Sequence, residues 1–205
     1  MSDSKTAQND SIKERISNFI QKATSPQASE EGNEFFDYAL STHIFLLEIQ
    51  ISKTRTPKVI IIIDGDDGVG IADCANVSRK IGAYFEEDDL FGKDENGEDR
   101  PYNLEVSSPG VDYGLHIFRQ YPQHVGRTLE FELKDGTKKV GKLQSIEDAH
   151  QDKEVNGETK KVFQITQEYQ VEEGKKGKLK TKYKPATINF EDIKVAHVQI
   201  SFKKK

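Results

Sequence analysis

The residues best suited to chemistry are four aspartates that gather in one short stretch of the chain: Asp64, Asp66, Asp67 and Asp73. Clustered carboxylates are the ligands that a divalent cation prefers, and the EF-hand loop is the best-known arrangement of this kind. Counted from Asp64, that loop needs glycine at its sixth position and glutamate at its twelfth, where this chain has Val69 and Ala75. The sequence therefore favours a polar turn that leads into a helix over a weak magnesium site.

The same stretch contains three glycines, Gly65, Gly68 and Gly70, between an expected strand and an expected helix. A phosphate-binding loop in this position has the pattern G-x-x-x-x-G-K-[ST], which is absent from the sequence. Four neighbouring carboxylates would also repel a phosphate group. Nucleotide binding is therefore disfavoured.

The other reactive residue types do not form a catalytic set. Cys74 falls on the apolar side of the expected helix, which favours a small buried hydrophobic residue over a nucleophile. The five histidines have no metal-binding spacing, and Val106 and Pro109 interrupt the Gly-x-Ser-x-Gly pattern around Ser107 and Ser108. We expect a binding protein without catalytic residues, metal or cofactor, and not an enzyme.

Lysines are concentrated on the expected hairpins of the C-terminal half: Lys138, Lys139, Lys142, Lys175, Lys176, Lys178, Lys180, Lys182 and Lys184. With Tyr169 and Tyr183 nearby, they are suited to contact an RNA backbone. Lysines that protect an exposed sheet edge are the alternative interpretation. The candidate partner-binding residues are Asp66, Asp67, Asp73, Lys175, Lys176 and Lys178.

These residues need elements to position them, and the N-terminal half has the pattern of a helix-plus-sheet domain. We expect a helix that starts at Ser11, strands over 43–53 and 58–64, a helix over about 72–86, and a strand over 102–106. The continuous apolar run from Val59 to Ile63 predicts a central strand that is buried on both faces, with helices packed against it.

The C-terminal half alternates like a small β-barrel. The predicted strands are 128–133, 139–146, 161–172, 179–184 and 195–202, with a short helix or turn at 118–125 and a helical turn at 190–193. Asp135-Gly136 is a strong hairpin signal. The expected organisation is a disordered tail (1–9), an α/β domain (10–114) and a β-barrel domain (115–205), an α+β protein.

Composition agrees with two small cores in a soluble, cytoplasmic protein. Of 205 residues, 34% are hydrophobic and 32% are charged, which suits two small cores better than one large core. The longest apolar run is far shorter than the ~20 residues of a membrane helix, and the polar N-terminus shows no secretory signal. We expect no membrane partner.

The net charge of −5 hides a reversal along the chain. Residues 1–115 contain 11 Lys/Arg and 22 Asp/Glu, a net charge of −11, whereas residues 116–205 contain 19 and 13, a net charge of +6. Opposite charges favour two surfaces with different partners, and two solvated surfaces that happen to differ are the alternative.

One segment, Leu104-Glu105-Val106-Ser107-Ser108-Pro109-Gly110, resembles the signature of the RimP family of bacterial ribosome maturation factors. The similarity extends upstream to Ile63-Asp64-Gly65 and Asp73-Cys74, and downstream to Gly126-Arg127 and residues 190–196, so that it covers most of residues 10–202. On physical grounds alone, Pro109-Gly110 ends a strand and permits a change of direction, as a domain junction requires.

The resemblance implies a monomeric, non-catalytic factor that binds the free small ribosomal subunit and promotes its maturation. It further implies a KH-like N-terminal domain, an SH3-like (Sm-like) C-terminal barrel, and a partner surface near small-subunit ribosomal protein twelve and rRNA. That ribosomal protein is basic, so the acidic half of the chain would attract it. No small-molecule substrate is implied. The alternative function is a stand-alone RNA-binding module that uses the basic C-terminal barrel.

The chain departs from the family pattern directly after the signature. Where the family usually has Asp-Arg-Pro-Leu, this chain has Asp112-Tyr113-Gly114-Leu115. Tyrosine lacks the bidentate fork of arginine, which puts any phosphate or carboxylate contact at this position in doubt. Glycine in place of proline is expected to loosen the joint between the domains.

Overall fold

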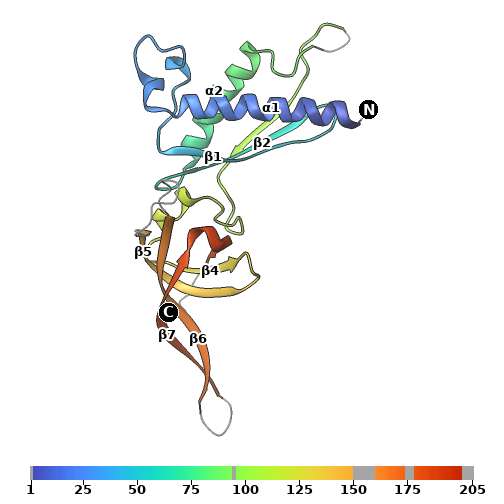
Figure 1. Ribbon diagram of the computed structural model, residues 1–205. Helices are drawn as coiled ribbons and strands as arrows, with labels where there is room; N and C mark the ends of the chain where they lie inside the picture. The colour runs from blue at the N-terminus through green and yellow to red at the C-terminus, as the bar shows by residue number, and fades with distance from the viewer. Residues whose placement is uncertain (1, 94–95, 150–159, 174–177, 200–205) are drawn as a thin grey trace. The chain divides into compact units, whose positions relative to one another are not determined.

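A computed structural model describes residues 2–93, 96–149, 160–173 and 178–199 (Figure 1). The fold is a mixed α+β fold, and the chain divides into two compact units, Met1–Pro109 and Gly110–Lys205. We call them the N-terminal unit and the C-terminal unit. The division falls inside the 104–110 segment, five residues before the expected domain boundary at 114.

The N-terminal unit is a three-stranded sheet with two α-helices. Its elements are α1 (Ser2–Ala23), the short 3-10 helices η1 (Pro26–Ser29) and η2 (Phe36–Tyr38), β1 (Ile44–Ile51), β2 (Lys58–Gly65), α2 (Ile71–Glu87) and β3 (Asn103–Ser107). The strand order is β1-β2-β3, with β1 antiparallel and β3 parallel to β2. As expected, the apolar β2 is the central strand, and α2 provides the crossover that a parallel pair requires.

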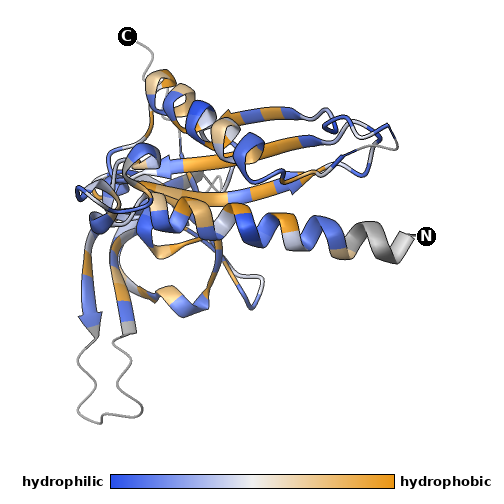
Figure 2. Ribbon diagram, turned by 90° about the horizontal axis from the view of Figure 1, so that it is seen from above, coloured by the Kyte–Doolittle hydropathy of each residue, from blue (hydrophilic) through white to orange (hydrophobic). Residues whose placement is uncertain are grey.

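Both helices pack on one face of this sheet. Apolar residues of α1 and α2 share a single core with Val59, Ile61 and Ile63, which are fully buried alternate residues of β2. The apolar stripes of the helices are visible in Figure 2. Ile60 and Ile62 on the other face are only half-buried, so the prediction of burial on both faces was wrong. The reason is that neither helix covers that face.

Helix α1 begins at Ser2 and not at the expected cap Ser11. Residues 2–9 are therefore helical where the sequence predicted a disordered tail. No glycine or proline occurs between Ser2 and Asp10, so nothing in this polar stretch interrupts the helix that the apolar residues from Ile12 onward anchor to the core.

The C-terminal unit is a five-stranded antiparallel sheet around a second core. Its elements are η3 (Phe118–Gln120), η4 (Pro122–His124), β4 (Thr128–Leu133), β5 (Lys138–Ala149), β6 (Lys160–Glu173), β7 (Lys178–Asn189), η5 (Phe190–Asp192) and β8 (Ile193–Val198). The strand order is β7-β6-β5-β4-β8. The predicted hairpin is confirmed: Gly136 has a φ of +83°, and its N–H donates to Leu133 O over 2.9 Å.

Gly114 is packed tightly within the C-terminal unit. The N–H of Leu115 donates to Ala196 O of β8 over 2.7 Å, which brings the backbone of Gly114 against this strand. A Cβ atom at Gly114 would lie 2.1 Å from Val195 Cγ2. The close packing therefore favours glycine at position 114. Its contacts with β8 fix this segment within the C-terminal unit.

Candidate functional site

The candidate residues of the N-terminal unit meet at one edge of its sheet. Because β2 and β3 are parallel, with Ile62 opposite Ser107, their carboxyl ends lie side by side. The loop over residues 64–70 leaves this edge and enters α2, while Ser107 leads into Pro109. The topology therefore brings the aspartate loop and the 104–110 segment together, although they are about forty residues apart in the sequence.

Two of the four aspartates hold the loop in shape. Asp64 is buried, and its Oδ1 accepts the Gly65 N–H over 2.8 Å. At the other end, Asp73 Oδ2 accepts the Gly70 N–H over 2.8 Å, so that its carboxylate lies at the N-terminus of α2, where the helix dipole favours a negative charge. This bond gives Asp73 a structural role, and its expected contact with a partner stays a prediction.

Cys74 in the first turn of α2 has the environment of a structural residue. Burial raises the pKa of its thiol, and the charge of Asp73 raises it further, although a hydrogen bond from the Ser108 backbone acts in the opposite direction. A thiol with a raised pKa stays protonated at neutral pH and is a poor nucleophile. The interpretation of Cys74 as a small hydrophobic residue agrees with its packing against the core.

The outer surface of this edge combines negative charge with an exposed apolar side chain. The Asp66 side chain is 40% exposed, with Oδ2 3.6 Å from Nδ1 of His43, and Asp67 is exposed. Ile71, the first residue of α2, is 91% exposed. We call Asp66, Asp67 and Ile71 the acidic edge. Within the described ranges, no three His, Cys, Asp or Glu residues are close enough to hold a metal ion, so the magnesium alternative gains no support there.

The first residues of the 104–110 segment stabilise the sheet of the N-terminal unit. Leu104 and Val106 pack against the core, and Glu105 forms an ion pair with Lys58 of β2 at 2.7 Å. Ser108 and Gly110 are exposed, and the two units divide between Pro109 and Gly110. This arrangement agrees with the expected role of the segment as a junction.

The basic candidates of the C-terminal unit are only partly described. Lys175 and Lys176 lie outside the described residues, and Lys178 is the first residue of β7, opposite Glu173. The sequence reasoning missed that Lys180, Lys182 and Lys184 of β7 all lie on one face of the β6–β7 hairpin. The alternation of Lys180, Lys182 and Lys184 was the available signal, but its meaning depends on the strand register.

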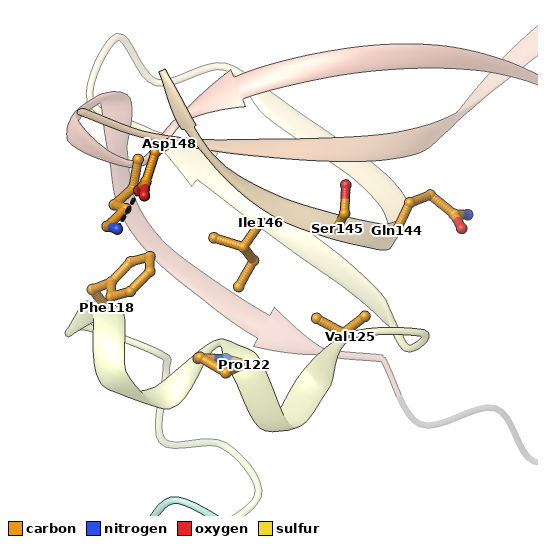
Figure 3. Close-up of a pocket in the computed structure, with 8 residues that line it drawn as sticks. Phe118, Pro122, Val125, Gln144, Ser145, Ile146 and Asp148 are labelled. Atoms are coloured by element: carbon orange, nitrogen blue, oxygen red, sulfur yellow. Dashed lines mark hydrogen bonds and ion pairs between the residues drawn. The ribbon is translucent and has the colours of Figure 1, made fainter. Parts of the chain in front are cut away.

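A pocket of about 480 Å³ lies on the C-terminal unit, and sequence reasoning did not anticipate it (Figure 3). Phe118, Pro122 and Val125 of the η3–η4 segment face Ile146 of β5 across it. Asp148 and Lys161 form an ion pair at one end, with the Lys161 ammonium 5.4 Å from the centre of the Phe118 ring. The pocket combines these apolar side chains with polar ones, Gln144 and Ser145, and the ion pair lies at its rim.

None of the described helices is both long enough and apolar enough to cross a membrane. The architecture defines a class: a two-unit α+β protein with an acidic sheet edge in one unit and lysine-bearing strands in the other. Residues 38–112 match the family model of the RimP N-terminal domain.

Two relatives extend the match along the chain. The ribosome maturation factor RimP of Cytophaga hutchinsonii is 35% identical over 161 residues, which covers 78% of this chain and 87% of the relative. The protein of the same name from Flavobacterium psychrophilum is 32% identical over 105 residues, which covers 50% of this chain and 60% of the relative. The chain belongs to the RimP family.

Proposed function

We propose that this chain acts in ribosome maturation as an assembly factor that binds the free small ribosomal subunit. The observation that carries the proposal is its 35% identity, over most of both chains, to a protein named ribosome maturation factor. The factor acts by binding and not by catalysis, as a monomer in the cytoplasm, and without a cofactor. Its N-terminal unit is KH-like, and its C-terminal unit is an SH3-like (Sm-like) barrel.

The proposed partner surfaces follow the charges of the two units. The N-terminal unit contains 11 Lys/Arg and 21 Asp/Glu, a net charge of −10, and the C-terminal unit contains 19 and 14, a net charge of +5. The acidic edge binds the basic ribosomal protein twelve, since complementary charge steers association and fixes orientation. The C-terminal unit, with the candidate residues Lys175, Lys176 and Lys178, lies against rRNA.

Sedimentation tests this proposal directly. Purified protein is mixed at low salt with free small subunits, free large subunits or complete ribosomes, and each mixture is centrifuged through a sucrose gradient. We expect comigration with free small subunits alone. Absence from the small-subunit fraction would refute the proposal. Tight binding to naked RNA without subunit binding would instead favour the stand-alone RNA-binding module.

The acidic edge can be tested with a matched pair of variants. Asp66→Asn with Asp67→Asn removes two adjacent charges from the edge, and Glu30→Gln with Glu31→Gln removes two adjacent charges from an exposed turn. We expect the first variant to bind purified ribosomal protein twelve about threefold to tenfold more weakly, the range for two exposed ion pairs. The second variant should bind like the unmodified protein. Equal losses in both variants would show a general charge effect and not a site.

A further inference from the structure

Strands β6 and β7 continue as a two-stranded ribbon past the rest of their sheet (Figure 1). Strand β5 pairs with β6 only as far as Val140 opposite Glu168, whereas β6 and β7 remain paired through Glu173 opposite Lys178. Within the described residues, no other strand pairs with this outer part of the ribbon, which has two faces.

The register assigns each residue to one of these faces. Directly opposed residues of an antiparallel pair lie on the same face, and successive pairs alternate between faces. The face that holds the buried pair Phe163 and Ile188 continues outward, two residues at a time, through the following residues: Gln167, Tyr169, Val171, Lys180, Lys182 and Lys184. We call these six residues the lysine face. Within residues 167–171 and 180–184, the opposite face carries Glu168, Gln170, Thr181 and Tyr183.

Charge is segregated between the two faces. Among residues 167–171 and 180–184, all three lysines lie on the lysine face and the single carboxylate, Glu168, lies on the opposite face; the next pairs of the register, Glu172 with Leu179 and Glu173 with Lys178, add one glutamate to each face. The two tyrosines are separated as well, Tyr169 with the lysines and Tyr183 with the glutamate. On the opposite face, Gln170 donates a hydrogen bond to Thr181 Oγ1 over 3.0 Å.

The spacing on the lysine face suits a nucleic-acid backbone. Alternate residues of a strand are about 6.8 Å apart, so Lys180, Lys182 and Lys184 form a row of positive charge about 14 Å long. Tyr169 is 36% exposed within this row, and the Lys184 ammonium lies 5.4 Å from the centre of its ring. Lysines that follow phosphates, together with an aromatic ring on which a base can stack, are the features by which proteins bind single-stranded RNA.

We propose that the lysine face of the β6–β7 ribbon binds single-stranded RNA, with the three lysines on phosphates and Tyr169 stacked on a base. The proposal rests on the function proposed above and names the surface that meets rRNA. Charge complementarity favours RNA as the partner, because a polyanion can neutralise a row of cations along its whole length. An acidic protein and simple protection of the edge strand β7 are competing explanations that the experiment separates.

The test compares two triple variants of the full chain that remove equal charge. One replaces Lys180, Lys182 and Lys184 with glutamine, and the control makes the same replacement at Lys134, Lys161 and Lys194, which lie after β4, on β6 and on β8 outside the ribbon. Binding of a fluorescein-labelled uridine 20-mer is measured by anisotropy at 50 and 200 mM KCl. Each lost phosphate contact should lower the slope of log affinity against log salt concentration by about 0.7. Raising KCl from 50 to 200 mM should therefore reduce the affinity of the unmodified protein about 15- to 20-fold more than that of the lysine-face variant. The control variant should retain the unmodified salt dependence.

A second matched pair tests the aromatic contact. We expect Tyr169→Leu to weaken binding of the uridine 20-mer about fivefold or more, the effect of one lost base stack, and Tyr183→Leu on the opposite face to leave it unchanged. Circular dichroism of each variant checks that the sheet is intact. Equal effects of the two leucine variants, or of the two lysine triples, would overturn the proposal.

Small-subunit sedimentation of the same variants separates the remaining outcomes. If the lysine-face variant binds RNA normally but loses the subunits, the partner is an acidic protein and the proposal is wrong. If it binds RNA normally and self-associates, the lysines protect an edge strand and the proposal is also wrong. If the unmodified protein fails to sediment with subunits, the assembly function fails by itself, and the RNA measurements still decide the role of the face.

Discussion

At the scale of single residues, the aspartate loop depends on the absence of one methyl group. The Gly68 N–H donates to Gly65 O over 2.9 Å, and a Cβ on Gly65 would lie 2.5 Å from the Gly68 carbonyl oxygen. Since backbone must move to admit the methyl group, we expect Gly65→Ala to lower the free energy of unfolding by about 1–3 kcal/mol. Urea unfolding followed by circular dichroism measures this loss.

Gly82 in the middle of α2 provides the control for this substitution. Nothing lies within 4 Å of a Cβ built there, so Gly82→Ala should instead raise the free energy of unfolding by about 1 kcal/mol through helix propensity. Losses of similar size at both glycines would contradict the steric explanation for Gly65.

A second residue-scale prediction concerns the departure at position 114. We expect Gly114→Ala to lower the free energy of unfolding by about 1–3 kcal/mol, because the added Cβ meets the stiff side chain of Val195. Gly110→Ala, where the space is open, should change it little. Addition of Val195→Ala to Gly114→Ala should recover part of the loss in a double-mutant cycle, and strict additivity of the two would refute the contact.

At the scale of elements, Arg15 of α1 forms an ion pair with Asp88, which directly follows α2. Burial alone would raise the pKa of Asp88, but hydrogen bonds from Tyr84 and Arg15 outweigh it and hold the pKa below its ordinary value. A carboxyl group with a depressed folded-state pKa stabilises the fold fully above its ordinary pKa of about 3.9. The stabilisation is lost as the pH falls through the lower folded-state value.

Asp88→Asn should therefore lower the free energy of unfolding at pH 7, and the loss should be smaller at about pH 2. The loss at pH 7 should not exceed about 1 kcal/mol, because both side chains of the pair are about 40% exposed. Asp89→Asn is the control: Asp89 has a φ of +42°, which asparagine tolerates equally well. Urea unfolding at both pH values measures the difference, and a loss at Asp88 that is equally large in acid would contradict the ion-pair explanation.

Elements set by local chemistry were predictable from the sequence, and those set by distant contacts were not. The Asp135-Gly136 hairpin was predictable because the turn residues and the flanking alternation lie within a few positions of each other. The apolar run of β2 indicated a central strand, but whether helices cover one face or two depends on packing partners that are far away in the sequence. For the same reason, the start of α1 was misjudged: anchoring by apolar residues further along extends the helix into a polar stretch.

The candidate site was predictable to the same extent. A strand, an acidic turn and a helix follow one another directly, so the aspartate loop could be located from the sequence. The parallel pairing of β2 with β3, which brings Ser108 beside Cys74, is a non-local contact without a local signal. The structural roles of Asp64 and Asp73 depend on loop geometry, and the lysine face depends on the β6–β7 register.

At the scale of the whole molecule, the opposite charges of the two units bear on selectivity. A protein distinguishes its partner from abundant competitors by a difference in affinity, to which repulsion contributes as much as attraction. The N-terminal unit, with a net charge of −10, repels RNA, while the C-terminal unit, with +5, attracts it. We therefore expect the acidic unit to weaken binding to RNA in general and to favour RNA sites that lie beside a cationic protein.

Neutralising remote acids of the N-terminal unit should then increase indiscriminate RNA binding. The test variant removes three exposed charges that are not part of the acidic edge, by Asp10→Asn, Glu30→Gln and Glu31→Gln. It should bind bulk tRNA about two- to threefold more tightly at 10 mM salt, where the Debye length is about 30 Å. At 150 mM salt, where that length is about 8 Å, the gain should disappear. Removal of three positive charges from the same unit should instead weaken tRNA binding at 10 mM salt; this variant is Lys13→Gln, Lys53→Gln, Arg55→Gln. If the acidic variant gained no affinity at 10 mM, or gained equally at both salt concentrations, the selectivity of the molecule would depend on contacts within its binding surfaces and not on the field of the N-terminal unit.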